Sequence, residues 1–208
     1  MMTRNLVLLL VLAGCTDPAQ GTIVGNPGLD VLRLASGLDV RTDAAEVAVD
    51  QIVLRDCEGV ATAVQVGATL DLVDGDGFDA PDGTFCEVEV RFAGDLTAQG
   101  VTTNGTASPV SLTLELQPAI MTGTAFTVGE DPLVIELAYP QWFAVAELVE
   151  GADGYEVGPG DPSHAGLVDR LVTGSAVFED ADANGTVSET ERSENELAKG
   201  VRRPGGGR

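Results

Sequence analysis

The feature of this 208-residue chain that most restricts its fold is a hydrophobic alternation with a period of two. In FCEVEVRF, residues 85–92, apolar side chains alternate with charged ones. The segments VSLTLEL, residues 110–116, and LVIELAY, residues 133–139, alternate in the same way. Because successive side chains of a strand point to opposite faces, each segment predicts a β-strand with one buried face.

Two further strand-like runs cover residues 46–55 and 61–73. The first loses its alternation midway, which is typical of a β-bulge. Turn signals separate the runs, and no βαβ alternation is present. The pattern therefore predicts a mainly β fold, an antiparallel β-sandwich of immunoglobulin-like or transthyretin-like type over residues 29–148. The turn signals are Asp74-Gly75-Asp76-Gly77, Pro81-Asp82-Gly83 and Asn104-Gly105.

The N-terminus, MMTRNLVLLLVLAGC, has the form of an export signal. Its apolar run from Leu6 to Leu12 is too short to span a bilayer but fits the apolar core of such a signal. The ending L-A-G-C resembles the lipobox of bacterial lipoproteins. That resemblance implies removal of a signal peptide, residues 1–14, and acylation of Cys15, so that a lipid anchor holds the protein on a membrane. The alternative is an ordinary secretory signal with a chance cysteine.

The residues after Cys15 refine this interpretation. In enterobacterial lipoproteins an aspartate directly after the cysteine retains the protein in the inner membrane, so Thr16 implies the outer membrane. The Gly- and Pro-containing stretch up to Gly28 predicts a flexible tether over residues 15–28. The strand AEVAVDQIVLRDC followed by the PDGTF hairpin resembles uncharacterised surface lipoproteins of Gram-negative bacteria over about residues 44–145. This resemblance supports the sandwich and implies no activity.

Export also bears on the other two cysteines, Cys57 and Cys86. An even number of cysteines in an oxidising compartment favours a disulfide over two buried thiols. Such a bridge closes a loop of about 30 residues, for roughly 3.6 kcal/mol on the chain-entropy estimate.

The charge balance is strongly acidic, with 11 Lys and Arg against 33 Asp and Glu. A negative charge of this size repels phosphate backbones, so the composition predicts a protein that does not bind nucleic acid. It suits divalent cations or cationic partners, although a merely solvated acidic surface would have the same composition.

The sequence DADANGTVSETE, residues 180–191, matches the calcium loop of an EF-hand, with glycine at the sixth position for the sharp turn. It predicts one calcium ion as the cofactor. The expected ligands are Asp180, Asp182, Asn184, the Thr186 carbonyl, Ser188 through a water, and Glu191 with both oxygens.

Part of this pattern has a rival explanation, because Ser188 and Glu191 also form a capping box for a following helix. The surroundings of the loop argue against a calcium sensor. Arg192 stands at position 13, where EF-hands prefer an apolar residue, and no second loop is present to pair with. We therefore predict a structural site within a helical segment, residues 149–199, followed by a disordered tail, residues 200–208.

The chain offers little that indicates an enzyme. Its only histidine, His164, adjoins Ser163, and adjacent residues cannot form a nucleophile–base pair unaided. The sequence therefore predicts a non-catalytic cell-envelope lipoprotein with a structural or binding role and an envelope protein or glycan as partner. One alternative is an adhesin or carbohydrate-binding module that uses Trp142. Another is a cryptic hydrolase, which requires clustered carboxylates of raised pKa in a cleft.

Overall fold

The computed structural model describes residues 19–25, 32–33, 39–129, 131–137, 149–151 and 154–202. The predicted signal peptide, Cys15 and Trp142 lie outside the described residues, as does the tail from residue 203 onward. The protein is mainly β, as the alternation predicts. None of the helices in the described ranges has the length and apolar character needed to cross a membrane.

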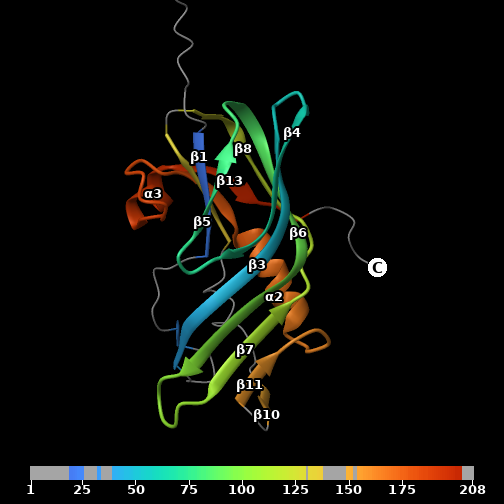
Figure 1. Ribbon diagram of the computed structural model, residues 1–208, viewed down its shortest axis with the longest axis vertical. Helices are drawn as coiled ribbons and strands as arrows, with labels where there is room; N and C mark the ends of the chain where they lie inside the picture. The colour runs from blue at the N-terminus through green and yellow to red at the C-terminus, as the bar shows by residue number, and fades with distance from the viewer. Residues whose placement is uncertain are drawn as a thin grey trace, which may run out of the picture.

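All the described strands belong to one sheet (Figure 1). Two helices, α2 (His164–Gly174) and α3 (Glu189–Glu194), lie against it. The strands are β1 (Ala19–Val24), β2 (Leu32–Arg33), β3 (Asp39–Arg55), β4 (Ala61–Asp71), β5 (Asp76–Ala80), β6 (Gly83–Thr102), β7 (Pro109–Leu114), β8 (Ala119–Val128), β9 (Leu133–Glu136), β10 (Val149–Gly151), β11 (Gly154–Val157), β12 (Ala176–Glu179) and β13 (Glu196–Gly200).

The sheet curls until it is nearly closed into a barrel-like shape. Its main path runs β4-β3-β6-β8-β13-β12-β9-β1-β5, so that β4 and β5 are the two end strands. The second half of β6 carries a branch through β7, β11 and β10. Most pairs are antiparallel, but β1 with β9 and β11 with β7 are parallel. The two packed sheets of a sandwich are not confirmed.

The curl originates in the two longest strands, β3 and β6. Their pairing shifts register at three places, between Thr42 and Ala44, Val47 and Val49, and Val49 and Gln51. Each shift bends the strands and increases the local twist. At the last place, β4 contributes Gly67 with a φ of 58°, a left-handed conformation that favours glycine. The bulge predicted within residues 46–55 is thereby confirmed.

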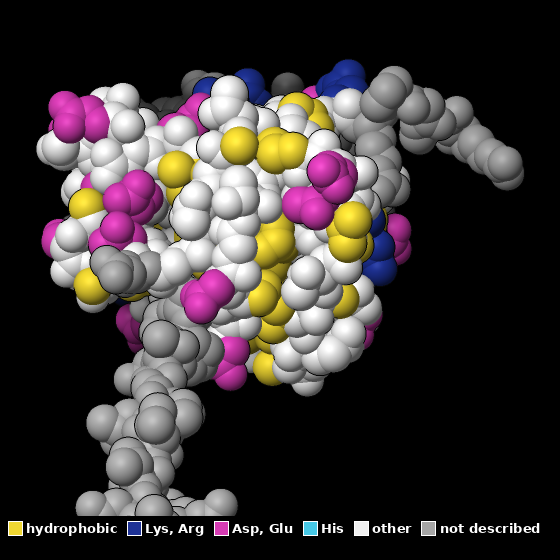
Figure 2. Space-filling view, turned by 90° about the horizontal axis from the view of Figure 1, so that it is seen from above, with side chains coloured by type: hydrophobic (Ala, Val, Ile, Leu, Met, Phe, Trp, Pro, Cys, Tyr) yellow, Lys and Arg dark blue, Asp and Glu magenta, His cyan; other side chains and the backbone are white. Residues whose placement is uncertain are grey.

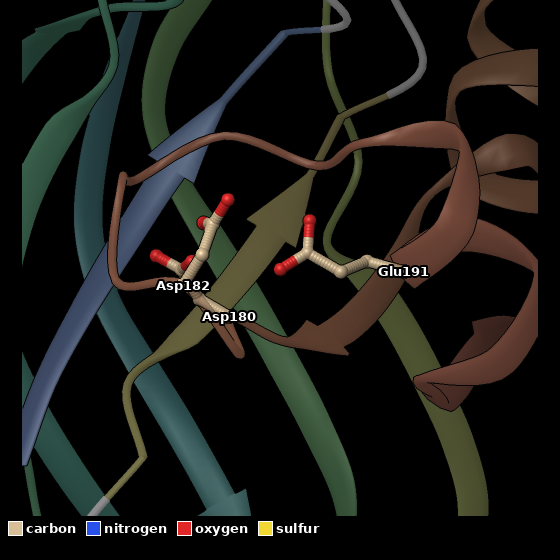
Figure 3. A group of neighbouring side chains, drawn as sticks. All are labelled: Asp180, Asp182 and Glu191. Carbon is tan, nitrogen blue, oxygen red and sulfur yellow. The ribbon is translucent and has the colours of Figure 1, made fainter.

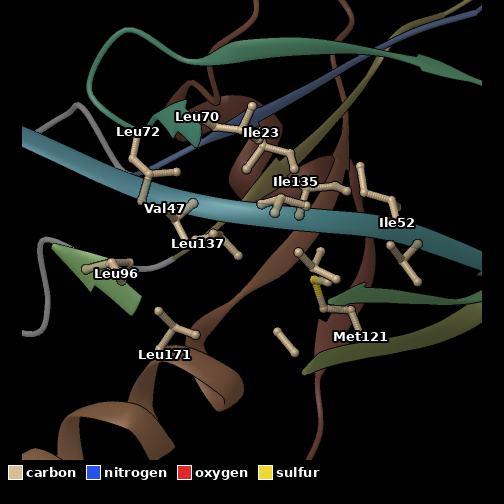
Figure 4. Close-up of a cluster of buried hydrophobic side chains, with 14 of the residues drawn as sticks. Ile23, Val47, Ile52, Leu70, Leu72, Leu96, Met121, Ile135, Leu137 and Leu171 are labelled. Atoms are coloured by element: carbon tan, nitrogen blue, oxygen red, sulfur yellow. The ribbon is translucent and has the colours of Figure 1, made fainter. Parts of the chain in front are cut away.

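The inner face of the curled sheet forms one hydrophobic core (Figure 4). The alternating residues Val110, Leu112 and Leu114 of β7 are buried in it, as the sequence predicts. Helix α2 adds Leu167 and Leu171 to the same core. Burying a side chain of this size stabilises the fold by about 1.5–3 kcal/mol, so the shared core holds the C-terminal elements to the strands.

Two boundaries predicted from the sequence are corrected. The flexible tether predicted over residues 15–28 is wrong where this segment forms β1. There the β-branched run Thr22-Ile23-Val24 pairs with β5 and β9, and Ile23 is fully buried. The segment 149–199 is not a separate helical unit either. Its strands β10 to β13 complete the same sheet. Short apolar runs such as AVFE bury their side chains by pairing with neighbouring strands of that sheet.

The disulfide between Cys57 and Cys86 is confirmed. It links the end of β3 to the start of β6, directly beyond the paired residues Arg55 and Glu87. The bridge therefore ties together the two strands on which the curl depends.

We expect replacement of both cysteines by alanine to lower the free energy of unfolding by about 3.6 kcal/mol, because the unfolded chain regains a loop whose ends are 29 residues apart. Chemical denaturation of the oxidised wild type and the double variant measures the difference. Equal stabilities would show that the native pairing of β3 with β6 does not benefit from the bridge.

Candidate calcium site

The predicted calcium loop connects β12 to α3 and returns through β13 to the sheet. The element entering the loop is thus a strand and not the expected helix. Backbone hydrogen bonds hold its entrance in place. The Asp180 amide donates to the Pro132 carbonyl at 2.9 Å, and the Glu179 amide donates to the Asn195 carbonyl at 3.2 Å. The loop is therefore held by two neighbouring segments of the fold.

Three of the predicted ligands converge, as Figure 3 shows. One carboxylate oxygen each from Asp180, Asp182 and Glu191 lies within 4.8 Å of the other two. Asp180 is 2% exposed and Glu191 is 5% exposed, whereas Asp182 is open to solvent. Carboxylate oxygens at this spacing are ligands that a hard divalent cation prefers.

The backbone between these acids is tightly turned. The Asp180 carboxylate accepts hydrogen bonds from the amides of Asn184 at 3.1 Å and Gly185 at 2.8 Å. Gly185 has a φ of 75°, which matches the role predicted for it. Ala183 also has a positive φ, 53°, which is uncommon for a residue with a side chain. The two residues in the left-handed conformation, Ala183 and Gly185, therefore both lie within this tight turn.

The remaining predicted ligands are held by bonds within the loop. The Asn184 side-chain oxygen accepts from the Thr186 amide at 2.7 Å, and its amide group donates to Asp182 at 2.9 Å. Ser188 Oγ accepts from the Glu191 amide at 3.2 Å, while the Glu191 carboxylate accepts from the Ser188 amide at 2.9 Å. The capping box is thus present as well. It requires only Ser188 and Glu191, so it does not explain the convergence of Asp180 and Asp182.

The two buried acids have pKa values shifted in opposite directions. Burial raises the pKa of Asp180. Hydrogen bonds from the Gly185 and Asn184 amides oppose this rise, and the neighbouring Asp182 and Glu191 add to it. The pKa of Glu191 is lowered, chiefly because the Ser188 backbone amide donates to its carboxylate. Glu191 therefore remains ionised readily, whereas ionisation of Asp180 is costly. A bound cation would offset both the burial and the repulsion.

The loop and α3 are joined to the sheet through a buried charge that the sequence did not reveal. All four residues of β9 are buried, so its outer face is covered as well as its inner one. On that face Glu136 is 5% exposed and accepts hydrogen bonds from Arg192 at 2.8 and 3.3 Å. Burial nevertheless raises the pKa of Glu136, and Arg192 opposes the rise. The arginine that is atypical for an EF-hand therefore serves as the partner of a buried acid.

Elsewhere, the structure places Ser163 directly before α2 and His164 at its first residue. His164 Nε2 accepts a hydrogen bond from the Glu115 amide at 3.2 Å. Ser163 Oγ has no hydrogen-bond partner in the part of the chain that the structure describes. A groove of about 320 Å³ contains Asp131, Glu179 and Glu196. The described acids of raised pKa, Asp180 and Glu136, do not line it.

No family model matches the sequence, and neither a curated protein nor a solved structure matches it. The interpretation of the site therefore rests on its own geometry.

We expect Arg192→Leu to destabilise the protein by about 2 kcal/mol at neutral pH, because it leaves the Glu136 carboxylate buried without its partner. The loss is smaller than for a fully buried pair because the Arg192 side chain is 35% exposed. A raised pKa makes the folded state favour protonated Glu136, and the variant raises that pKa further. The destabilisation should therefore shrink as the pH falls through this pKa.

The matched control is the double variant Arg192→Leu with Glu136→Gln, in which neither charge of this pair remains. Denaturation across a pH series compares both variants with the wild type. A destabilisation by Arg192→Leu that is independent of pH, and equal with or without Glu136→Gln, would show that Arg192 acts only by packing.

Proposed function

We propose that this chain is a non-catalytic, lipid-anchored protein of the bacterial cell envelope whose loop at residues 180–191 binds one structural calcium ion. The observation that carries the calcium proposal is the convergence of Asp180, Asp182 and Glu191 within a sequence of EF-hand spacing. Asn184, the Thr186 carbonyl and Ser188 through a water would complete the coordination after small rotations within the loop. The role is structural because the loop connects two strands of the sheet.

A structural role follows from what the ion would hold together. The acids lie between β12 and β13, which pair with each other and with β9 and β8. A cation bridging Asp180 at the entrance and Glu191 at the exit would restrain the connection between these strands. The absence of a paired loop from the sequence is consistent with an affinity in the range of extracellular modules, with Kd about 0.1–1 mM.

The anchor is proposed on the lipobox ending at Cys15, and the outer membrane on Thr16. An oxidising compartment is consistent with the disulfide between Cys57 and Cys86. Calcium of millimolar concentration outside the cytoplasm would suffice to load a site of this affinity. The proposed location outside the cytoplasm and the proposed calcium site are therefore consistent with each other.

We expect calcium, but not magnesium, to raise the melting temperature of residues 16–208 relative to EDTA. At about a hundredfold excess over Kd the gain is roughly 2.7 kcal/mol, or about 5–10 °C for a domain of this size. Glu191→Gln should abolish the gain, because the amide supplies only one neutral oxygen. Glutamine still completes a capping box, so the variant separates the metal from the helix cap.

Glu194→Gln is the control, since it removes the same charge from α3 at an exposed position outside the cluster. It should keep the full response to calcium. A melting temperature that is unaffected by millimolar calcium would leave the loop as an acidic turn with a helix cap.

For the anchor, we expect a fatty-acid label to be incorporated into the full chain in a Gram-negative host and to be lost in Cys15→Ser. Thr16→Asp is the matched control. It should retain the label, while membrane fractionation finds the protein in the inner rather than the outer membrane. Label retained by Cys15→Ser would contradict lipidation at this residue.

A further inference from the structure

The nearly closed sheet leaves a gap between its two end strands. Among the described residues, β4 pairs only with β3 and β5 pairs only with β1. The two strands are joined at one end by the turn after Asp71 and move apart towards the other (Figure 1). We call this gap the seam. Each end strand has one edge whose backbone groups are not used by another described strand, and both edges border the seam.

The seam is a groove of about 520 Å³. Its apolar lining comes from Val64, Val66, Ala68 and Leu70 of β4 and from Phe78 of β5. Val64 and Val66 are only half-buried, although they pack against the core. The space-filling view from above shows a stripe of hydrophobic side chains open on this end of the molecule (Figure 2). A missing strand at this position would account for core residues that remain accessible to water.

Apart from the bulge at Gly67, the edge of β4 lacks the usual protection against pairing. Natural edge strands carry lysine, proline or inward-pointing charges that prevent association with another chain. Residues 61–70 of β4 contain none of these. Gly67 interrupts the strand with its bulge, but the run ATAVQV before it is uncharged and extended. This edge is therefore suited to accept a further strand.

The rim of the seam is acidic and has no cation of its own. Five aspartates and no Lys or Arg occur between residues 71 and 82, and Asp76 and Asp79 line the groove. Of the basic side chains that the structure describes, all except Arg170 form ion pairs elsewhere in the fold. The charge of the rim is thus uncompensated within the described molecule, and a cationic ligand is favoured.

We propose that the seam is a β-augmentation site for an extended segment of another polypeptide in which apolar residues alternate with lysine or arginine. The two free strand edges would supply main-chain hydrogen bonds on both sides of the segment. Its apolar side chains would cover Val64, Val66 and Phe78, and its basic side chains would face Asp79 and the acidic rim. The site does not require an occupied calcium loop.

The test uses a fluorescently labelled, end-blocked peptide of alternating valine and lysine with the full oxidised protein, and measures anisotropy. Two control peptides separate the contributions. Glutamate in place of lysine reverses the charge, and N-methylation of alternate residues removes backbone donors. We expect binding of the lysine peptide and at least about tenfold weaker binding of each control.

Hydrogen exchange locates the peptide. The backbone amides of residues 61–70 and 76–80 should both gain protection when the lysine peptide binds. Asp79→Lys should weaken binding by about tenfold, whereas Asp95→Lys, an equal charge change at an exposed position that does not line the seam, should not. Absence of binding, equal binding of the charge-reversed peptide, or binding without protection of both strands would overturn the proposal.

Discussion

The fold depends above all on the pairing of β3 with β6, because this pair bends the sheet so that its inner face encloses the hydrophobic core. Three register shifts along this pair bend both strands, and the disulfide fixes their far end. Strands on either side then follow the curvature until β4 and β5 face each other. The register shifts add to the normal twist of the two long strands and turn their apolar face towards the core.

The curl has a second consequence for the C-terminal segment. Once the inner face is filled, the outer face of β9 still carries Val134 and Glu136, which are both buried. The connection from β12 to β13 passes this outer face, and Arg192 pairs with Glu136 there. A partly buried ion pair therefore attaches α3, the helix that follows the candidate calcium loop, to the sheet. An ion bound in this loop would strengthen a connection that the fold already positions.

The structure also shows where the few basic residues of this acidic chain are placed. Two of the few arginines, Arg55 and Arg91, neutralise the buried Glu89 on the outer face of β6, and Arg192 neutralises Glu136. These three arginines therefore lie where an unpaired buried carboxylate would be most costly. The aspartates beside the seam, Asp76 and Asp79, have no such partner among the described basic side chains. This distribution favours cations as ligands for both the loop and the seam.

The sequence by itself determined the β class, the disulfide and the clustering of the acids in the loop. These features follow from period-two alternation, from cysteine number and from ligand spacing within one short segment, and all of them are local or nearly so. Only the tertiary structure decided that the strands form one curled sheet, that β1 is a strand of it, and that Arg192 meets Glu136, 56 residues away in the chain. Pairing between distant strands depends on which apolar faces can be buried together. The local pattern of side chains in one strand does not specify which other strand it pairs with.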